Sequence, residues 1–198
     1  MTKSLHVVLD MDETLIHGSL LDKPSLDPVV TPLGACVYLR PGVRAFLQKS
    51  FFSFASVSLF SAASIEWIAC VMDVLGPDVK RNFLLVLDNR FLHNATKDLN
   101  ILYESEIGKE HNMNSTNTIL MDDIKESAHY NPNNLLHVQG WDIHVKKPGE
   151  DALLDKAYHT LMDIQTKVAK GQSVRDIEKP YLHSQSSQSS QSSQYCKC

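Results

Sequence analysis

The chain has few cysteines, and their placement excludes a disulfide framework. Cys36 and Cys70 lie in apolar stretches, whereas Cys196 and Cys198 fall within the last three residues, and no spacing repeats. A disulfide-stapled domain needs matched sets of cysteines, so a reducing compartment is the default expectation. Two thiolates are too few for a strong metal site by themselves, and we interpret the Cys196–Cys198 segment as part of a solvated tail.

Long uninterrupted apolar runs are also missing. The most apolar stretch, residues 51–76, carries several serines together with Glu66 and Asp73. It is therefore typical of a strand followed by a helix and not of a membrane span. Residues 1–9 are too short for a secretory signal and are followed at once by acidic residues. We expect a soluble intracellular protein, in the nucleus or the cytoplasm, with no membrane partner.

An excess of positive charge is the third absence. The 198 residues include 19 Lys and Arg against 23 Asp and Glu, which gives a net charge of −4. This balance disfavours nonspecific binding to nucleic acid or to anionic membranes as the main function. Hydrophobic residues make up 43% and charged residues 21%, as in a soluble globular chain. A chain of this length can bury the hydrophobic core of one domain without disulfides or a structural metal to stabilise it.

Strand-like and helix-like segments alternate along the chain. Short apolar runs predict strands at residues 5–9, 37–39, 52–60, 117–121 and 135–138. Apolar residues at helical spacing predict helices at residues 41–48, 62–75 and 150–169. The alternation favours an α/β fold with a Rossmann-like parallel sheet flanked by helices. In such sheets ligands bind at the carboxyl ends of the strands.

Two segments interrupt this alternation. Residues 18–36 are rich in Pro, Asp, Ser and Gly, which predicts a loop or a small flap. In residues 82–93, Asp88-Asn89 stands between two apolar runs, which is typical of a two-residue β-hairpin turn. We therefore expect a small flap or hairpin insertion in addition to the parallel sheet.

The end of the sequence has a different composition. Residues 184–194 read SQSSQSSQSSQ, a low-complexity repeat with almost nothing to bury. We expect one domain over residues 1–169, followed by a polar, Ser/Gln-rich, disordered tail over residues 170–198.

Paired acidic residues follow two of the predicted strands. Asp10 and Asp12 come just past the first strand, and Asp122-Asp123 come just past the strand at residues 117–121. Like charges held this close repel one another, and burial adds to the cost. A bound hard cation such as Mg²⁺ relieves the repulsion and prefers oxygen ligands. Lys97 offers a further balancing charge.

The spacing of these acids alone leaves an alternative. An acidic loop that merely caps a strand, with Thr14 as a helix N-cap, fits the residues at least as well. The wider sequence favours a functional site over this structural alternative. Residues 10–17 read DMDETLIH, and four further elements follow in order: Arg40-Pro41-Gly42-Val43 with Phe46-Leu47, Leu59-Phe60-Ser61-Ala62-Ala63, Lys97-Asp98-Leu99, and Ile119-Leu120-Met121-Asp122-Asp123 with the trailing Asn131-Pro132 and Asn134.

These elements resemble the motifs of the haloacid dehalogenase-like phosphatases. The match is to the branch that holds the RNA polymerase II C-terminal-domain phosphatases and the NLI-interacting-factor-like phosphatases, whose first motif is DxDETLxH. The likeness covers roughly residues 5–165. Five ordered elements are hard to meet by chance.

The resemblance implies a Mg²⁺-dependent phosphatase that acts through an aspartyl-phosphate intermediate. Asp10 would be the nucleophile, and Asp12 the general acid and base. Thr14 and Ser61 would bind the phosphate or orient Asp10, and Lys97 would neutralise the phosphate charge. The family also implies a set of metal-site residues, which are Asp10, Asp12 through its backbone carbonyl, Asp123, and Asp122, the last pairing with Lys97 or a metal-bound water.

The substrate implied by the resemblance is phosphoserine or phosphothreonine in a protein, with the RNA polymerase II C-terminal domain as a candidate. The gaps between the motifs are too short for a large cap domain, and an open site suits a protein loop. The arginine and cysteine that many relatives carry before the third motif are not matched here, and whether Arg90 replaces them stays open. A phosphatase for nucleotide ends or small phosphorylated molecules is therefore an alternative. A catalytically silent phosphopeptide-binding module with the same fold is another.

Overall fold

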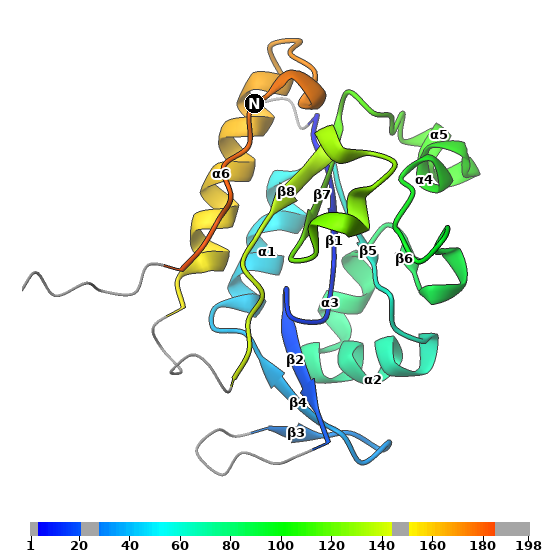
Figure 1. Cartoon of the computed structure of the whole chain (residues 1–198), viewed down its shortest axis with the longest axis vertical. Coiled ribbons are helices and arrows are strands. Elements are labelled where there is room, and N and C mark those ends of the chain that lie inside the picture. Colours follow the sequence, from blue (N-terminus) through cyan, green and yellow to red (C-terminus); the bar gives the residue numbers. More distant parts are fainter. Residues whose placement is uncertain (1–3, 21–27, 144–150, 185–198) are drawn as a thin grey trace, which may run out of the picture.

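A five-stranded parallel sheet forms the centre of this computed structural model, which describes residues 4–20, 28–143 and 151–184 (Figure 1). The strand order is β6-β5-β1-β7-β8. The strands are β1 (His6–Leu9), β5 (Ser56–Phe60), β6 (Val86–Leu87), β7 (Thr118–Asp122) and β8 (Leu135–His137). β1 lies in the middle and pairs in parallel with β5 and β7. The predicted Rossmann-like α/β fold is confirmed.

Alternate side chains of β1 enter two separate cores. Val7 and Leu9 join the larger core, and Val8 joins the smaller one. Successive strand residues point to opposite faces of a sheet, so one buried strand of four residues supports both layers. The larger core is covered by α1 (Val43–Ser53), α2 (Ile65–Leu75) and α6 (Leu153–Val168), and the smaller one by α4 (Asn100–Glu104). α3 (Pro77–Asn82) packs on α1 and α2, and α5 (Glu106–Glu110) packs on α4.

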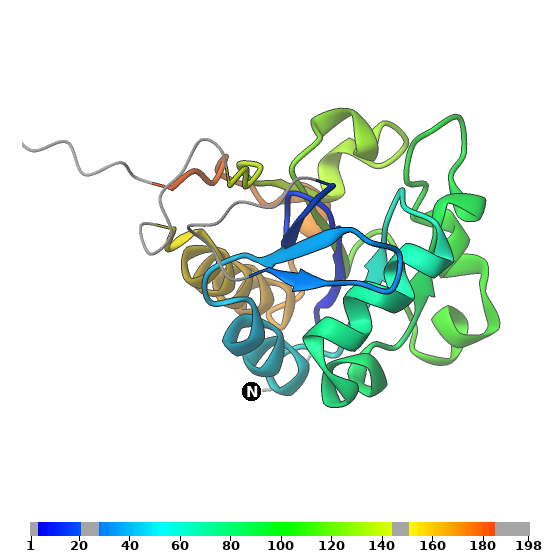
Figure 2. The same ribbon diagram turned by 90° about the horizontal axis from the view of Figure 1, so that it is seen from below.

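A small antiparallel sheet is inserted between β1 and α1. It consists of β2 (Ile16–Ser19), β3 (Val29–Val30) and β4 (Cys36–Leu39), in the order β2-β4-β3. It lies below the parallel sheet in Figure 1, and Figure 2 looks onto it from below. This sheet is the small flap that the composition of residues 18–36 predicts, within the described part of that stretch.

The predicted hairpin over residues 82–93 is wrong. β6 pairs in parallel with β5 as an edge strand of the central sheet, and a 3-10 helix over Asn89–Phe91 follows it. The Asp88 side chain accepts a hydrogen bond from the backbone N–H of Arg90 at 2.9 Å. Asp88 therefore caps a helical turn, which an Asx residue does as readily as it forms a hairpin turn.

Two element boundaries also differ from the sequence-based expectation. α1 continues to Ser53, so β5 begins at Ser56 and not at residue 52. The apolar run at this junction buries Phe54 but leaves Phe52 exposed. An apolar run without clear alternation does not distinguish a helix end from a strand start.

Residues 170–184, which the sequence suggests belong to a polar tail, pack against the domain in the structure. Val174, Ile177 and Leu182 are buried in the larger core. The backbone N–H of Leu182 donates to the carbonyl of His137 at 3.0 Å, and Gln139 N–H donates to Leu182 at 2.7 Å. The packed part of the chain thus extends beyond residue 169. Three buried side chains in an irregular, otherwise polar segment leave no periodic signal in the sequence. The Ser/Gln repeat after residue 184, with Cys196 and Cys198, lies outside the described residues.

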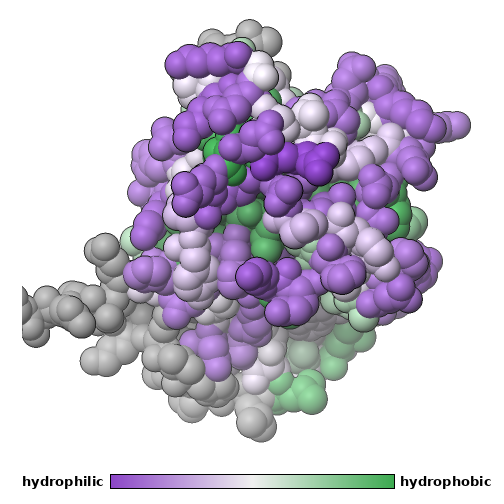
Figure 3. All heavy atoms as spheres, turned by 45° about the horizontal axis from the view of Figure 1, so that its top comes forward, coloured by the Kyte–Doolittle hydropathy of each residue, from purple (hydrophilic) through white to green (hydrophobic). Residues whose placement is uncertain are grey.

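The exterior is mostly hydrophilic on the face drawn in Figure 3. Within the described ranges, no helix is both long enough and apolar enough to cross a membrane.

Candidate active site

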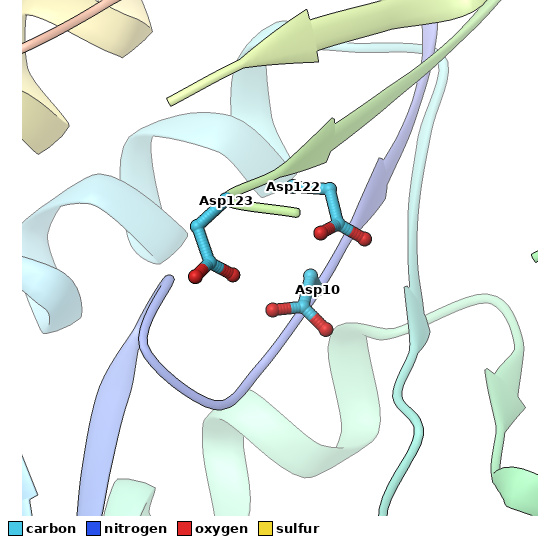
Figure 4. Close-up of side chains that lie close together, drawn as sticks. All are labelled: Asp10, Asp122 and Asp123. Carbon is cyan, nitrogen blue, oxygen red and sulfur yellow. The ribbon is translucent and has the colours of Figure 1, made fainter. Parts of the chain in front are cut away.

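Three aspartates meet at the carboxyl ends of two neighbouring strands. Asp10 follows β1, while Asp122 ends β7 and Asp123 follows it. The parallel register pairs Leu9 with Met121, and the backbone N–H of Asp10 donates to the carbonyl of Met121 at 2.9 Å. One carboxylate oxygen from each aspartate lies within 4.8 Å of the other two. Figure 4 shows the three carboxylates pointing toward one another. We call these three residues the aspartate cluster.

Lys97 is the cation that faces the aspartate cluster. Its Nζ donates to Asp10 Oδ1, and to Asp122 Oδ2 at 2.7 Å. The lysine side chain is only 3% exposed. Burial by itself lowers the pKa of Lys97, but Asp10 and Asp122 outweigh it, so the pKa is raised and the lysine stays charged.

The aspartate cluster is short of positive charge. Burial raises the pKa of Asp10 to about 7, Lys97 opposes that rise, and the charge of Asp122 adds to it. The pKa of Asp123 is also raised, first by burial and then by Asp122. Of the described residues, only Lys97 forms an ion pair with any of these three carboxylates, so a further cation at this position would balance the remaining negative charge.

The donor set fits a hard divalent cation. Carboxylate oxygens are the ligands that Mg²⁺ prefers, and the cluster supplies three side chains that converge on one region. Asp123 is held in place by its neighbours. The Thr14 hydroxyl donates to Asp123 Oδ1 at 3.3 Å, and His137 Nε2 lies 3.0 Å from the Asp123 carbonyl. Such supporting contacts around a carboxylate are typical of a built metal site.

Asp12 stands apart from the aspartate cluster. Its carboxylate accepts a hydrogen bond from Trp67 Nε1 at 2.8 Å on Oδ1 and contacts the Ser61 hydroxyl at 3.4 Å on Oδ2. The Ser61 oxygen in turn accepts from the Ala63 N–H at 3.0 Å. The pKa of Asp12 is raised by burial, with the Trp67 hydrogen bond opposing the rise. The Asp12 side chain is thus held outside the aspartate cluster, and its role as general acid and base stays a prediction.

Arg40 fixes the loop that carries Asp12. Its buried guanidinium donates to the Thr14 carbonyl at 2.9 Å, to the Gln139 carbonyl at 3.0 Å and to Asp151 Oδ2 at 3.1 Å. These contacts connect the loop after β1 to the loop after β8 and to the segment before α6. A buried guanidinium with this many partners makes the loop rigid.

The structure brings most of the predicted site residues together. Asp10, Asp122 and Asp123 form one cluster with Lys97, and Thr14 contacts Asp123. Ser61 contacts Asp12. The proposed metal contact of the Asp12 carbonyl and the phosphate contacts of Thr14 and Ser61 stay predictions. Arg90 forms an ion pair with Asp88 at 2.7 Å and its side chain is 68% exposed, so its role in a substrate groove also stays a prediction.

Sequence reasoning missed three residues that shape the site. Trp67 contacts Asp12, Arg40 ties the loops together, and Gly140 lies against Asp123, where an added Cβ would sit 2.9 Å from Oδ2. Arg40 stands in a recognised motif, but its role was not assigned. Trp67 and Gly140 had no signal beyond their positions near other motifs.

Comparison with known proteins identifies the family. The model of the NLI interacting factor-like phosphatases matches residues 5–175. The chain is 31% identical over 143 residues to the CTD small phosphatase-like proteins of Homo sapiens and Mus musculus, which covers 68% of this chain. It spans about half the length of these relatives, 48%.

Solved structures show the same fold at lower identity. A structure of Fcp1, an essential RNA polymerase II CTD phosphatase, matches with a TM-score of 0.54 and 22% identity, over 84% of this chain and 52% of that one. A structure of fission yeast Fcp1 bound to beryllium fluoride matches with the same TM-score and 16% identity. This match covers 92% of this chain and 58% of the Fcp1 chain. The family match, the ordered motifs and the aspartate cluster agree with one another. The chain belongs to the NLI interacting factor-like phosphatase family, in the CTD-phosphatase branch of the haloacid dehalogenase-like superfamily.

Proposed function

We propose that this protein is a Mg²⁺-dependent phosphomonoester hydrolase that acts on phosphoserine or phosphothreonine in proteins. The observation that carries the proposal is the buried Asp10–Lys97–Asp122 arrangement at the carboxyl ends of β1 and β7, with Asp123 beside it. A buried carboxylate with a lysine aimed at it is suited to receive a phosphoryl group whose charge the lysine then balances.

The first half of the reaction transfers the phosphoryl group to Asp10. A carboxylate oxygen of Asp10 attacks phosphorus, and the bond from phosphorus to the serine or threonine oxygen breaks. Asp12 in its protonated form gives its proton to that leaving oxygen, so the product is a neutral alcohol. Lys97 balances the negative charge on the phosphoryl oxygens during the transfer to Asp10.

The second half regenerates the enzyme. Asp12, now a carboxylate, takes a proton from water, and the water oxygen attacks the phosphorus of the aspartyl-phosphate. The bond between phosphorus and the Asp10 oxygen breaks, which releases inorganic phosphate. Asp12 again carries a proton and Asp10 is again a carboxylate, so the cycle closes.

Asp10, Asp122 and Asp123 are the side chains that would hold Mg²⁺, with the Asp12 carbonyl as the further ligand that the family implies. When bound, the ion neutralises charge so that a phosphate dianion can approach the aspartates. Thr14 and Gly140 fix the position of the Asp123 carboxylate, which would orient that side chain toward the ion.

Gly140→Ala tests the metal assignment. The added methyl group would lie 2.9 Å from Asp123 Oδ2 and has to displace that carboxylate. We expect Mg²⁺ affinity, measured by calorimetric titration, to fall by about 10-fold or more. Thermal stability in EDTA should change little. Added to Asp123→Asn, the substitution should cost no further affinity, and an additive loss in the double variant would contradict the assignment.

The surroundings of the site support a macromolecular substrate. Within the described residues, the insertion between β1 and α1 is the small β2-β4-β3 sheet and not a large cap. A site without a large lid admits a phosphorylated loop of a protein. The matched relatives are named CTD small phosphatase-like proteins, and the Fcp1 structures are described as RNA polymerase II CTD phosphatase. We propose that same polymerase domain as a candidate substrate, a nuclear or cytoplasmic location, and a catalytic domain followed by a polar tail.

A substrate panel tests the proposed function. We expect hydrolysis of phosphoserine and phosphothreonine peptides in Mg²⁺ and none in EDTA. Their kcat/KM should exceed that of nucleoside monophosphates and sugar phosphates by about 10-fold or more. A preference for the small phosphates would contradict a protein substrate and support the alternative, a phosphatase for nucleotide ends or small phosphorylated molecules. A folded chain that binds a phosphopeptide without turnover would identify a silent binding module.

A further inference from the structure

The indole of Trp67 lies in direct contact with the side chain proposed as general acid and base. We propose that Trp67 is a positioning residue that holds Asp12 in the orientation needed to protonate the leaving oxygen. The inference rests on the proposed function and goes beyond it, because the hydrolytic mechanism by itself needs no tryptophan.

The contact is short and comes from a fixed backbone. Trp67 Nε1 donates to Asp12 Oδ1 at 2.8 Å, across 55 positions of sequence. Trp67 lies in the first turn of α2, where its backbone N–H donates to the side chain of the N-cap residue Ser64 at 3.3 Å. The ring also packs against the larger core. The position of the indole N–H is therefore set by helix and core and not by Asp12 itself.

A glycine in the small sheet makes room for the ring. A Cβ added to Gly18 would lie 2.6 Å from Trp67 Cζ2 and 3.2 Å from Cη2. Contacts below 3.0 Å force one of the two groups to move. The indole thus fills the space between β2 and Asp12, and its position depends on the absence of a side chain at residue 18.

The chemistry of the indole assigns different roles to the two oxygens of Asp12. An indole N–H donates a hydrogen bond and cannot accept one. Oδ1 is therefore the accepting oxygen, and an unprotonated carboxyl oxygen is the better acceptor. We therefore place the proton that Asp12 transfers on Oδ2, whose other contact is the long hydrogen bond that the Ser61 hydroxyl donates to it at 3.4 Å. Without the indole, only the longer Ser61 contact orients the carboxyl group, and fewer molecules present the proton in the right direction.

A series of leaving groups separates positioning of the acid from a structural role. Protonation matters most when the leaving oxygen is a poor leaving group, as in phosphoserine, and least when it is a good one, as in 2,4-dinitrophenyl phosphate. The value of kcat/KM reports the steps up to loss of the leaving group, so it isolates the step in which Asp12 acts as acid.

Trp67→Phe removes the N–H and keeps an aromatic ring. We expect kcat/KM for a phosphoserine peptide to fall about 10- to 100-fold, and that for 2,4-dinitrophenyl phosphate to change less than about threefold. Trp141→Phe is the matched control. Trp141 is 3% exposed and its Nε1 has no hydrogen-bond partner among the described residues. Its substitution should leave the ratio between the two substrates unchanged.

Gly18→Ala is the second variant, and it leaves the Trp67 and Asp12 side chains chemically unchanged. By displacing the indole it should give the same selective loss on the phosphoserine peptide. Equal losses on both substrates in Trp67→Phe and Gly18→Ala would overturn the positioning role and leave the proposed function intact. A folded wild-type chain without Mg²⁺-dependent turnover of either substrate would overturn the proposed function and the positioning role together.

Discussion

Asp10→Asn is expected to abolish turnover of both para-nitrophenyl phosphate and phosphopeptides. The amide keeps the size of the side chain but is not a nucleophile, so no aspartyl-phosphate forms. Removal of a nucleophile that works as part of one constellation costs about 10³-fold or more in kcat. The measurement is the initial rate in Mg²⁺ and in EDTA, together with the thermal unfolding midpoint of each variant.

The control for this result is Asp163→Asn, which makes the same chemical change at an exposed position on α6. It should retain full activity. Residual activity of Asp10→Asn within about tenfold of wild type would contradict the nucleophile assignment. If Asp10→Asn unfolds, trapping of a phosphorylated protein with radiolabelled substrate and mapping of the modified residue answers the same question on the wild-type chain.

Lys97→Met should lower stability and activity together. The substitution leaves Asp10 and Asp122 buried without their cation. Loss of one partner from a buried ion pair costs about 3–5 kcal/mol in the free energy of unfolding. The rate should fall by about 10²-fold or more, since the charge on the phosphoryl group is no longer balanced. Urea unfolding in EDTA gives the stability change, and initial rates in Mg²⁺ give the activity.

The exposed pair of Lys49 and Asp155 supplies the matched control. These side chains lie 3.3 Å apart and are 50% and 61% exposed. Lys49→Met should therefore cost less than about 1 kcal/mol. The double variant Lys97→Met with Asp122→Asn should recover part of the lost stability, because it removes one of the two stranded charges. A loss in Lys97→Met as small as that in Lys49→Met would contradict the buried ion-pair network.

The pH dependence of the Lys97→Met variant has a defined sign. Burial already raises the pKa of Asp10 to about 7 in the folded protein, and Lys97 opposes the rise. Loss of the lysine raises that pKa further above the unfolded value, so the folded variant binds a proton more tightly than the unfolded chain. The stability deficit should be larger at pH 8 than at pH 5.

Local sequence patterns were sufficient for the fold and for the identity of the acids. Residues 6–9 and 118–122 are short apolar runs followed by aspartates, and parallel strands place their carboxyl ends at one edge of a sheet. A strand of this kind is specified by its own side chains, because it is buried on both faces. The ordered motifs then identified the family, which the family match confirms.

Local sequence patterns did not predict the turn at Asp88 or the burial of three side chains near the C-terminal end of the described chain. Asp88 caps a 3-10 helix where the sequence favoured a hairpin turn, because a short polar side chain stabilises both. Val174, Ile177 and Leu182 are buried although the segment around them is polar and irregular. Their burial depends on the surface that the rest of the domain presents, which no nearby residue encodes.

The sequence by itself determined the parallel sheet, the acids at its edge and the family. Only the tertiary structure decided which carboxylates meet and which stand apart. The register of β1 against β7 gathers Asp10, Asp122 and Asp123, whereas the Trp67 indole holds Asp12 outside that cluster. These contacts join residues far apart in the sequence, so they exist only once two layers pack on one sheet and fix the distances between their side chains.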